Sequence, residues 1–319
     1  MPLHYACPTR LLENARQLPP LPIAVAAANS PFALEGAWRA QQEGVVEPVL
    51  VGDPVHIQRI AKEIGWPLEG TRIVRAEDDE DAARRAVALA RSGECGAVMK
   101  GHLHTDTLML AALQKDIGLR AGRRFTHAFF MSAPAWQRGL LLSDAAINVR
   151  PSIDTKFDIV KNVVELGHAL GIPEPRVALL SCTEEVTDRV QSSLDANEVA
   201  ARWRDSGQQD ALVHGPLAFD VAMSPEAARI KGIDHPVAGH ADALVVSDID
   251  SGNALFKMMV HFMGATAAGV VLGASVPIVL TSRADSPQAR LISAAVARLL
   301  AAEQGGTPIL QKTSEGRHA

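Results

Sequence analysis

The amino-acid sequence predicts an α/β fold in which buried strands alternate with helices. Short apolar runs are separated by longer stretches whose apolar residues recur at helical spacing. The runs are apolar at nearly every position, which is typical of strands covered on both faces in a parallel sheet. We expect strands at residues 22–28, 48–51, 96–100, 127–131, 139–142, 176–181, 211–214, 243–247 and 277–281. We expect helices at residues 79–92, 105–116, 155–170, 252–263 and 286–302.

Helix start and stop signals support this assignment. Ser30-Pro31 and Ser286-Pro287 each place a capping hydroxyl before a proline at the first helical position. Gly171 directly follows one expected helix, as a helix stop does.

A length of 319 residues is sufficient for two α/β domains, each with its own core. Two segments are candidates for a boundary between them. One is the turn-rich stretch 131–134, and the other is the glycine- and alanine-rich stretch 264–274, whose small residues suit a hinge or a close backbone approach.

Composition excludes several classes of function. The formal net charge is −5 with both signs spread along the chain, which argues against a surface for nucleic acid or acidic lipid. Aromatic residues make up only 4%, which leaves little material for stacking on bases. The three cysteines show no metal-ligand spacing, the N-terminus lacks a signal-peptide pattern, and no long apolar run predicts a membrane span. We therefore expect a cytoplasmic protein.

The first candidate site segment follows an expected strand and opens an expected helix at Lys100-Gly101-His102-Leu103-His104-Thr105. Open α/β sheets bind ligands at such strand ends, and the N–H groups of a helix start favour an anion. Lys100 would add charge, Gly101 would allow close approach, and Thr105 would cap the helix. A metal site built from His102, His104 and Asp106 is a weaker alternative because no other cluster supplies ligands. A polar loop without function is another.

The second candidate is Thr281-Ser282-Arg283-Ala284-Asp285-Ser286, where an apolar strand leads into a helix through polar groups. An arginine can bind phosphate with two hydrogen bonds and stabilise charge that develops during a reaction. No motif around Ser282 marks it as a nucleophile, so hydrogen bonding is its expected role. A capped helix start with a charged surface would explain the segment as well.

A third segment, residues 241–257, ends a strand in acidic residues and a glycine before a helix. Asp248 and Asp250 could bind a cation or cap the helix, and Asn253 and Lys257 lie one turn apart on one face. The pattern is a weak signal by itself. Neither a phosphate-binding P-loop motif nor the dinucleotide-binding glycine motif occurs, which disfavours nucleotide kinases and ordinary oxidoreductases.

Taken together, these segments resemble the phosphate acetyltransferase/phosphate butyryltransferase family along nearly the whole chain. The matching motifs are Lys100-Gly101…His104-Thr105, Leu142-Ser143-Asp144-Ala145-Ala146-Ile147-Asn148, the acidic stretch 241–253, and residues 280–286. The local sequence of these motifs is most similar to the butyryltransferase-like branch and to the acyltransferase part of enoyl-CoA hydratase/phosphate acetyltransferase fusions. No hydratase segment precedes Met1, so hydratase activity is not expected.

The resemblance implies a fold similar to isocitrate and isopropylmalate dehydrogenases, with two three-layer α/β domains, a cleft between them, and a homodimer. Residues 1–131 with 270–319 would form the first domain, and residues 132–269 the inserted second domain. The implied reaction moves a short acyl group between coenzyme A, which is a substrate, and inorganic phosphate. The thiolate attacks the acyl phosphate directly in a ternary complex, without a bound cofactor or metal.

The resemblance also suggests residue roles. Ser282 would donate a hydrogen bond, Arg283 would clamp phosphate, and Lys100, Gly101, His102, His104, Thr105, Asp250, Asn253 and Lys257 would bind substrate. Two departures matter. The acetyltransferase branch has a carboxylate, proposed as the thiol base, seven positions after the serine, where this chain has Ala289. The same branch has an arginine about where Met109 stands. Asp285 is the expected substitute for the base.

Two other functions stay open from the sequence. Asp242, Asp248 and Asp250 would suit a metal- and NAD-dependent hydroxy-acid dehydrogenase of the same fold. The second alternative is a non-catalytic relative that has kept the fold. The fold does not exclude it, because function resides in the site.

Overall fold

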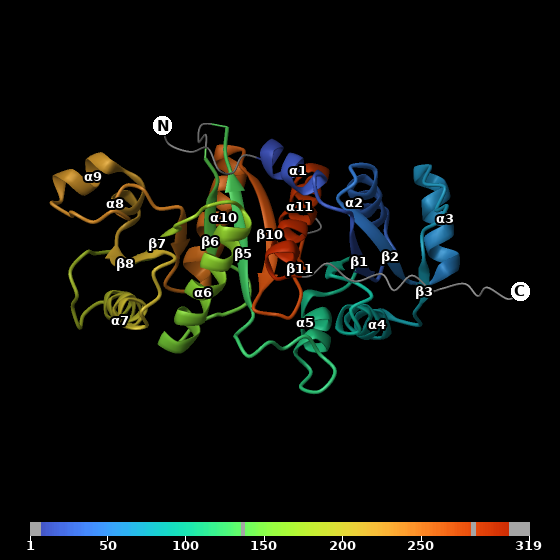
Figure 1. The fold of residues 1–319 in the computed structure, drawn as a ribbon, viewed down its shortest axis with the longest axis horizontal. Helices are drawn as coiled ribbons and strands as arrows, with labels where there is room; N and C mark the ends of the chain where they lie inside the picture. Colours follow the sequence, from blue (N-terminus) through green and yellow to red (C-terminus); the bar gives the residue numbers. More distant parts are fainter. Residues whose placement is uncertain (1–7, 135–137, 282–284, 306–319) are drawn as a thin grey trace, which may run out of the picture.

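The computed structural model describes residues 8–134, 138–281 and 285–305. Its described strands form one sheet with the order β3-β2-β1-β4-β11-β10-β5-β6-β9-β7-β8, which runs through the length of the molecule (Figure 1). The strands are β1 (Leu21–Ala26), β2 (Val46–Gly52), β3 (Ile73–Arg75), β4 (Ala97–Lys100), β5 (Thr126–Ser132), β6 (Leu140–Ser143), β7 (Arg176–Leu180), β8 (Leu212–Leu217), β9 (Ala243–Val245), β10 (Thr266–Leu272) and β11 (Ile278–Val279).

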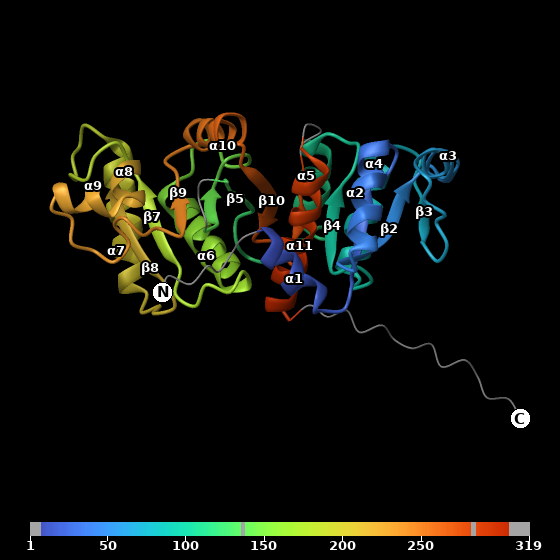
Figure 2. The same ribbon diagram turned by 90° about the horizontal axis from the view of Figure 1, so that it is seen from above.

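Helices flank the sheet (Figure 2). They are α1 (Pro8–Arg16), α2 (Pro31–Gln42), α3 (Pro54–Ile64), α4 (Asp79–Arg91), α5 (Thr105–Leu113), α6 (Ile153–Ala169), α7 (Gln191–Asp205), α8 (Phe219–Met223), α9 (Pro225–Ile230), α10 (Ile249–Met263) and α11 (Pro287–Glu303). The α/β fold class and all five expected helices are confirmed. Among the described residues, no helix combines the length and the apolar character needed to cross a membrane.

The expectation of a parallel sheet is correct in the outer parts and wrong in the middle. In one outer part, the neighbouring strands β3, β2, β1, β4 and β11 pair parallel. In the other outer part, β6, β9, β7 and β8 do the same. In between, β10 is antiparallel to both β11 and β5, and β5 is antiparallel to β6. The two outer parts therefore run in opposite directions.

The stretch 264–274, which the sequence suggests as a hinge or a place of close backbone approach, is mostly the central strand β10. Its small residues let α11 approach the sheet closely, and the Gly269 N–H donates to Ser293 Oγ on α11 at 3.1 Å. The C-terminal helix α11 consequently lies beside α1 and α2, which come from the start of the chain (Figure 1). The expected domain boundaries fall inside β5 and β10, and the sheet continues through both; the division into two domains stays a prediction.

The cores on the two faces of the sheet differ. On one face, a single cluster extends from α2 and α3 through α11 to α6 and α7, and includes Val25, Phe130 and Val270. On the other face the buried residues form two clusters, one under α4 and α5 and the other under α8 and α10. The break between these two clusters lies over the middle of the sheet.

The caps that the sequence predicts at Ser30, Ser286 and Asp248 are present. The Ser30 and Ser286 hydroxyls accept from backbone N–H groups at the starts of α2 and α11, and the Asp248 carboxylate does so at α10. Gly171 follows α6 with a left-handed φ of 84°, as its expected stop role requires.

Candidate active site

A cleft of about 440 Å³ occupies the break between the two clusters. Its walls come from five separate segments of the chain: the β4–α5 loop, β5, the loop after β6, α10, and the segment after β11. The lining residues are Lys100, Leu103, His104, Thr105, His127, Phe129, Ala145, Ala146, Asn253, Phe256, Lys257, Leu280, Thr281 and Asp285. Six of these were predicted as site residues from the sequence: Lys100, His104, Thr105, Asn253, Lys257 and Asp285.

The β4–α5 loop supplies one wall. Lys100 is buried at the end of β4, and its Nζ donates to the Leu103 carbonyl oxygen at 3.1 Å. His104, and not Thr105, occupies the N-cap position of α5, and its side chain makes no capping bond. The expectation that Thr105 caps the helix is therefore wrong. The first N–H groups of α5 are left without a side-chain acceptor among the described residues, which makes this helix start suitable for an anion.

Gly101 has a packing role. Its N–H donates to the Ala26 carbonyl oxygen at 2.8 Å, and a Cβ at this position would lie 2.4 Å from the Ala27 carbonyl oxygen. Only glycine allows this close contact between the β4–α5 loop and the end of β1. Gly101 thereby positions Lys100 and His104.

Helix α10 supplies the opposite wall. Asn253 and Lys257 line the cleft one turn apart, as the sequence predicts. The Phe256 ring stacks on Phe129 of β5 with centroids 4.0 Å apart. Asp250 is exposed and is not among the residues that line the cleft, because the Asp248 cap places it on the outer side of the first turn. The assignment of Asp250 as a binding residue therefore lacks support.

The loop after β6 is organised by Asp144, whose carboxylate is buried. It accepts hydrogen bonds from the N–H groups of Ala146, Ile147 and Asn148 and, at 2.6 Å, from the Asn148 side chain. A Cβ at Gly252 would lie 2.7 Å from the Asp144 carbonyl oxygen, so α10 packs directly on this loop. The motif at residues 142–148 thus contains a turn that hydrogen bonds to Asp144 hold in place, and Ala145 and Ala146 of this turn line the cleft.

The floor of the cleft contains His127, which sequence reasoning missed. It lies on β5 two residues before Phe129, so both side chains point to the same face of the sheet. The imidazole is fully buried, and neither ring nitrogen has a hydrogen-bond partner among the described residues. Burial lowers the pKa of His127 to about 4, while Asp144 and the Leu280 carbonyl act in the opposite direction.

The segment after β11 reaches the cleft through Leu280, Thr281 and Asp285. Thr281 is buried and Asp285 is half-buried. Ser282 and Arg283, the predicted hydrogen-bond donor and phosphate clamp, lie outside the described residues.

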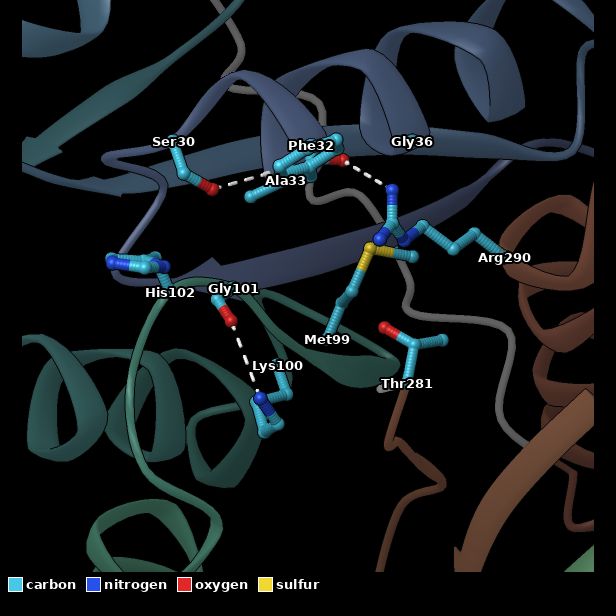
Figure 3. Close-up of a pocket in the computed structure, with 10 residues that line it drawn as sticks. All are labelled: Ser30, Phe32, Ala33, Gly36, Met99, Lys100, Gly101, His102, Thr281 and Arg290. Atoms are coloured by element: carbon cyan, nitrogen blue, oxygen red, sulfur yellow. Dashed lines mark hydrogen bonds between the residues drawn. The ribbon is translucent and has the colours of Figure 1, made fainter. Parts of the chain in front are cut away.

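A second hollow of about 100 Å³ adjoins the cleft and shares Lys100 and Thr281 with it (Figure 3). Gly101 and His102 line this hollow, and His104 lines the larger cleft, so the two histidines do not share a hollow. Arg290 reaches from α11 toward the start of α2, where its Nη1 donates to the Phe32 carbonyl oxygen at 3.3 Å. The sequence did not distinguish Arg290 from the surface charges of its helix.

The other acidic residues of the third segment have structural partners. Asp242 receives a bidentate hydrogen bond from Arg176 at 2.8 and 3.0 Å, and Asp248 caps α10. In the described part of the chain, no group of three or more histidine, cysteine or acidic side chains is arranged to hold a metal ion.

Comparison with known families identifies this arrangement. The family described as "Phosphate acetyl/butaryl transferase" matches residues 79–298, which include all five segments that line the cleft. The chain belongs to this family. Membership confirms the reaction class that the sequence predicts, that of a phosphate acyltransferase.

Relatives with both acyl preferences are similar to the chain. A phosphate acetyltransferase of Rickettsia typhi is 44% identical over 292 residues, covering 91% of this chain and 83% of that protein. A phosphate butyryltransferase of Clostridium acetobutylicum is 38% identical over 280 residues, covering 88% and 93% respectively.

Solved structures agree on the fold. A branched-chain phosphotransacylase of Enterococcus faecalis superposes with a TM-score of 0.77 at 32% identity, covering 88% of this chain and 99% of that one. A 4-hydroxythreonine-4-phosphate dehydrogenase of Klebsiella pneumoniae matches with a TM-score of 0.51 at 14% identity, covering 88% and 99%, and shows the fold alone. This match to a dehydrogenase agrees with the fold that the resemblance implies.

Gly101→Ala tests the close contact under the site. We expect a loss of about 3 kcal/mol in the free energy of unfolding, because the new methyl group would overlap a backbone oxygen that cannot move freely. Urea unfolding measures this loss. Gly122→Ala is the matched control: φ there is 79° but nothing lies within 4 Å, so only backbone strain of about 1 kcal/mol is expected. Equal losses in the two variants would contradict a role for close packing at Gly101.

Proposed function

We propose that the cleft binds an acyl phosphate and the thiol end of coenzyme A together, and that it catalyses reversible transfer of a short acyl group between coenzyme A and inorganic phosphate. The observation that carries the proposal is the convergence of basic, hydrogen-bonding and apolar groups from five segments on one cleft. Holding both substrates in one place replaces a bimolecular encounter with an intramolecular step, which can contribute about 7 kcal/mol to lowering the barrier.

Positive charge at the cleft suits the phosphate group. Lys100 lies in the wall formed by the β4–α5 loop, Lys257 lies on α10 in the opposite wall, and the start of α5 adds backbone N–H groups. Since the chain has a net charge of −5, this attraction is local. Arg283 is the further cation of the proposal, by its resemblance to the family's Ser-Arg pair; its neighbours Thr281 and Asp285 line the cleft.

The reaction needs stabilisation of the oxyanion that forms when sulfur attacks the carbonyl carbon. Ser282, Thr105 and Asn253 are the hydrogen-bond donors we assign to this charge or to the phosphate oxygens. As the carbon–oxygen bond breaks, negative charge accumulates on the departing phosphate, where Arg283 and the lysines act. Asp285 is one candidate for the group that takes the thiol proton.

The acyl chain would contact the apolar part of the cleft. Leu103, Phe129, Ala145, Phe256 and Leu280 supply this surface, and the stacked pair Phe129–Phe256 closes one side of it. We propose that this pair limits the length of acyl chain that fits. Assembly as a homodimer and a cytoplasmic location stay predictions.

Arg283→Ala tests the phosphate clamp. The purified protein should convert coenzyme A and acetyl or butyryl phosphate to a thioester, measured by its ultraviolet absorbance. We expect the variant to lose about 100-fold to 1,000-fold in kcat, since a charge-stabilising donor is removed in the transition state. Arg202→Ala is the control and should keep full activity, because it removes a half-exposed arginine of α7 that pairs with Glu198 on the same helix and with Asp154 on α6. No thioester from wild-type protein with any acyl phosphate from acetyl upward would refute the proposed function.

Phe256→Leu tests the limit on acyl length. Shortening the stacked ring should raise the ratio of kcat/KM for butyryl-CoA to that for acetyl-CoA by about tenfold, because one or two more methylenes gain burial. The assay follows release of coenzyme A with phosphate as co-substrate. Phe262→Leu provides the control on the same helix, since this ring is 87% exposed. An unchanged ratio in Phe256→Leu would show that the acyl chain binds elsewhere.

A further inference from the structure

His127 is a titratable side chain in the floor of the cleft, and the proposed mechanism gives it no role. Its ring is completely buried, and both ring nitrogens lack a hydrogen-bond partner among the described residues. Buried polar atoms are nearly always paired, so an unpaired imidazole next to a cleft requires an explanation.

The packing around His127 leaves room for the ring and holds it in place. A Cβ at Gly269 would lie 2.9 Å from His127 Nε2, so glycine at this position of β10 makes the space. Phe129 contacts the ring edge-on with centroids 4.4 Å apart. Ser143 Oγ donates to the His127 carbonyl oxygen at 2.9 Å and fixes the backbone. The ring is thus preorganised, which is a property of groups that act on a substrate.

His127 is neutral at neutral pH, because burial lowers its pKa to about 4. One ring nitrogen therefore has a lone pair, and no donor reaches it among the described residues. The low pKa makes the ring a weak base, so a proton that it takes is held only briefly. The Asp144 carboxylate and the Leu280 carbonyl both favour the protonated form. They therefore offset part of the cost of placing a positive charge on the buried ring during the reaction.

The neighbourhood of His127 also includes the position where this chain lacks a carboxylate. Ala289 is buried in the first turn of α11, and the Ser293 hydroxyl donates to its carbonyl oxygen at 2.8 Å. Ser293 Oγ in turn accepts from the N–H of Gly269, the residue against which His127 packs. Two hydrogen bonds and one packing contact therefore connect Ala289 with His127.

We infer that His127 is the catalytic base of this enzyme: it accepts the proton of the coenzyme A thiol and passes it to the departing phosphate. The inference rests on the proposed function and names the group that Ala289 cannot supply. His127 is favoured over Asp285 because its ring borders the cleft and its nitrogens have no hydrogen-bond partner to give up among the described residues.

The step is balanced without another reactant. The S–H bond breaks as its proton moves to His127, and the sulfur lone pair forms the S–C bond to the acyl carbon. The C–O bond to phosphate then breaks, and its electron pair leaves with the phosphate. His127 returns the proton to a phosphate oxygen, which yields the thioester and hydrogen phosphate. In the reverse direction the same proton moves from hydrogen phosphate to sulfur.

Other ionisable groups face the same cleft and must be separated from His127 in any measurement of pH dependence. Lys100 and His104 come from the β4–α5 loop, Lys257 from α10 and Asp285 from the segment before α11. The Asp144 carboxylate acts on the ring through its charge. These groups are present in wild-type protein and in a His127 variant, so the difference between the two pH profiles reports on His127.

His127→Gln is the decisive variant, and thioester formation from acetyl phosphate between pH 6 and 8 is the measurement. Glutamine keeps a polar side chain of similar length but cannot take a proton. We expect kcat/KM at pH 7 to fall by about 100-fold to 10,000-fold, with little change in the KM for acetyl phosphate. The remaining rate should rise about tenfold per pH unit, because only thiol that is already ionised can react, whereas the wild-type profile should be nearly flat.

Three comparisons make the test selective. Thr126→Val changes the preceding residue, whose side chain accepts from Asn162 Nδ2 on the opposite face of β5, and should keep the wild-type profile. His127→Asn is the second variant in case the glutamine side chain prevents folding. Asp285→Asn should not acquire the steep profile; if it does while His127→Gln remains flat, Asp285 is the base.

Each failure has a distinct signature. An active wild-type enzyme whose own kcat/KM rises tenfold per pH unit from 6 to 8 would overturn the role of His127 even without variants. A His127→Gln variant with a wild-type profile would do the same. Inactive wild-type protein would instead refute the proposed function.

Discussion

The antiparallel pairing of β5 with β10 is the constraint on which the rest of this structure depends. It joins two parallel sheets of opposite direction into one, through seven consecutive residue pairs from Thr266↔Ser132 to Leu272↔Thr126. Without it, the walls of the cleft would belong to two units with no fixed relation. Because strand residues alternate between faces, the same pairing sends Phe130 and Val270 into the continuous core and leaves His127, Phe129 and Gly269 under the cleft.

Glycines at three positions let the elements around the cleft pack closely enough to form the site. Gly269 leaves space for the His127 ring, Gly252 lets α10 rest on the Asp144 loop, and Gly101 lets the β4–α5 loop rest on β1. At each of these positions a methyl group would collide with backbone or with the imidazole. The polar side chains are therefore positioned by close backbone contacts, which are stiffer than contacts between side chains.

Much of this arrangement was predictable from sequence, for physical reasons that also explain the failures. Long apolar runs such as β1 and β4 were recognisable, and Lys100, Asn253 and Lys257 were found because polar residues at strand-to-helix junctions meet at one edge of a sheet. The short strand β3 is only half-buried and has no such run. The strand β10 was not among the expected strands, because its alanines and glycines suit a hinge and close backbone packing equally. His127 was missed because a single histidine in an apolar strand has the same local pattern whether it fills a core or faces a cleft; only the break between two core clusters distinguishes the cases.

The loss of a carboxylate at Ala289 need not disable the enzyme, given where the thiol proton goes. In the forward direction the proton ends on phosphate, whose second ionisation falls in the neutral pH range. The protein must therefore carry the proton across the cleft and does not have to retain it. A buried neutral histidine can do this, because its lone pair is available at neutral pH and its protonated form readily passes the proton on. A carboxylate in the place of the His127 ring would add a negative charge near a phosphate dianion, and the repulsion would oppose binding. A neutral imidazole adds no such charge. The basic residues of the cleft can then serve the phosphate alone.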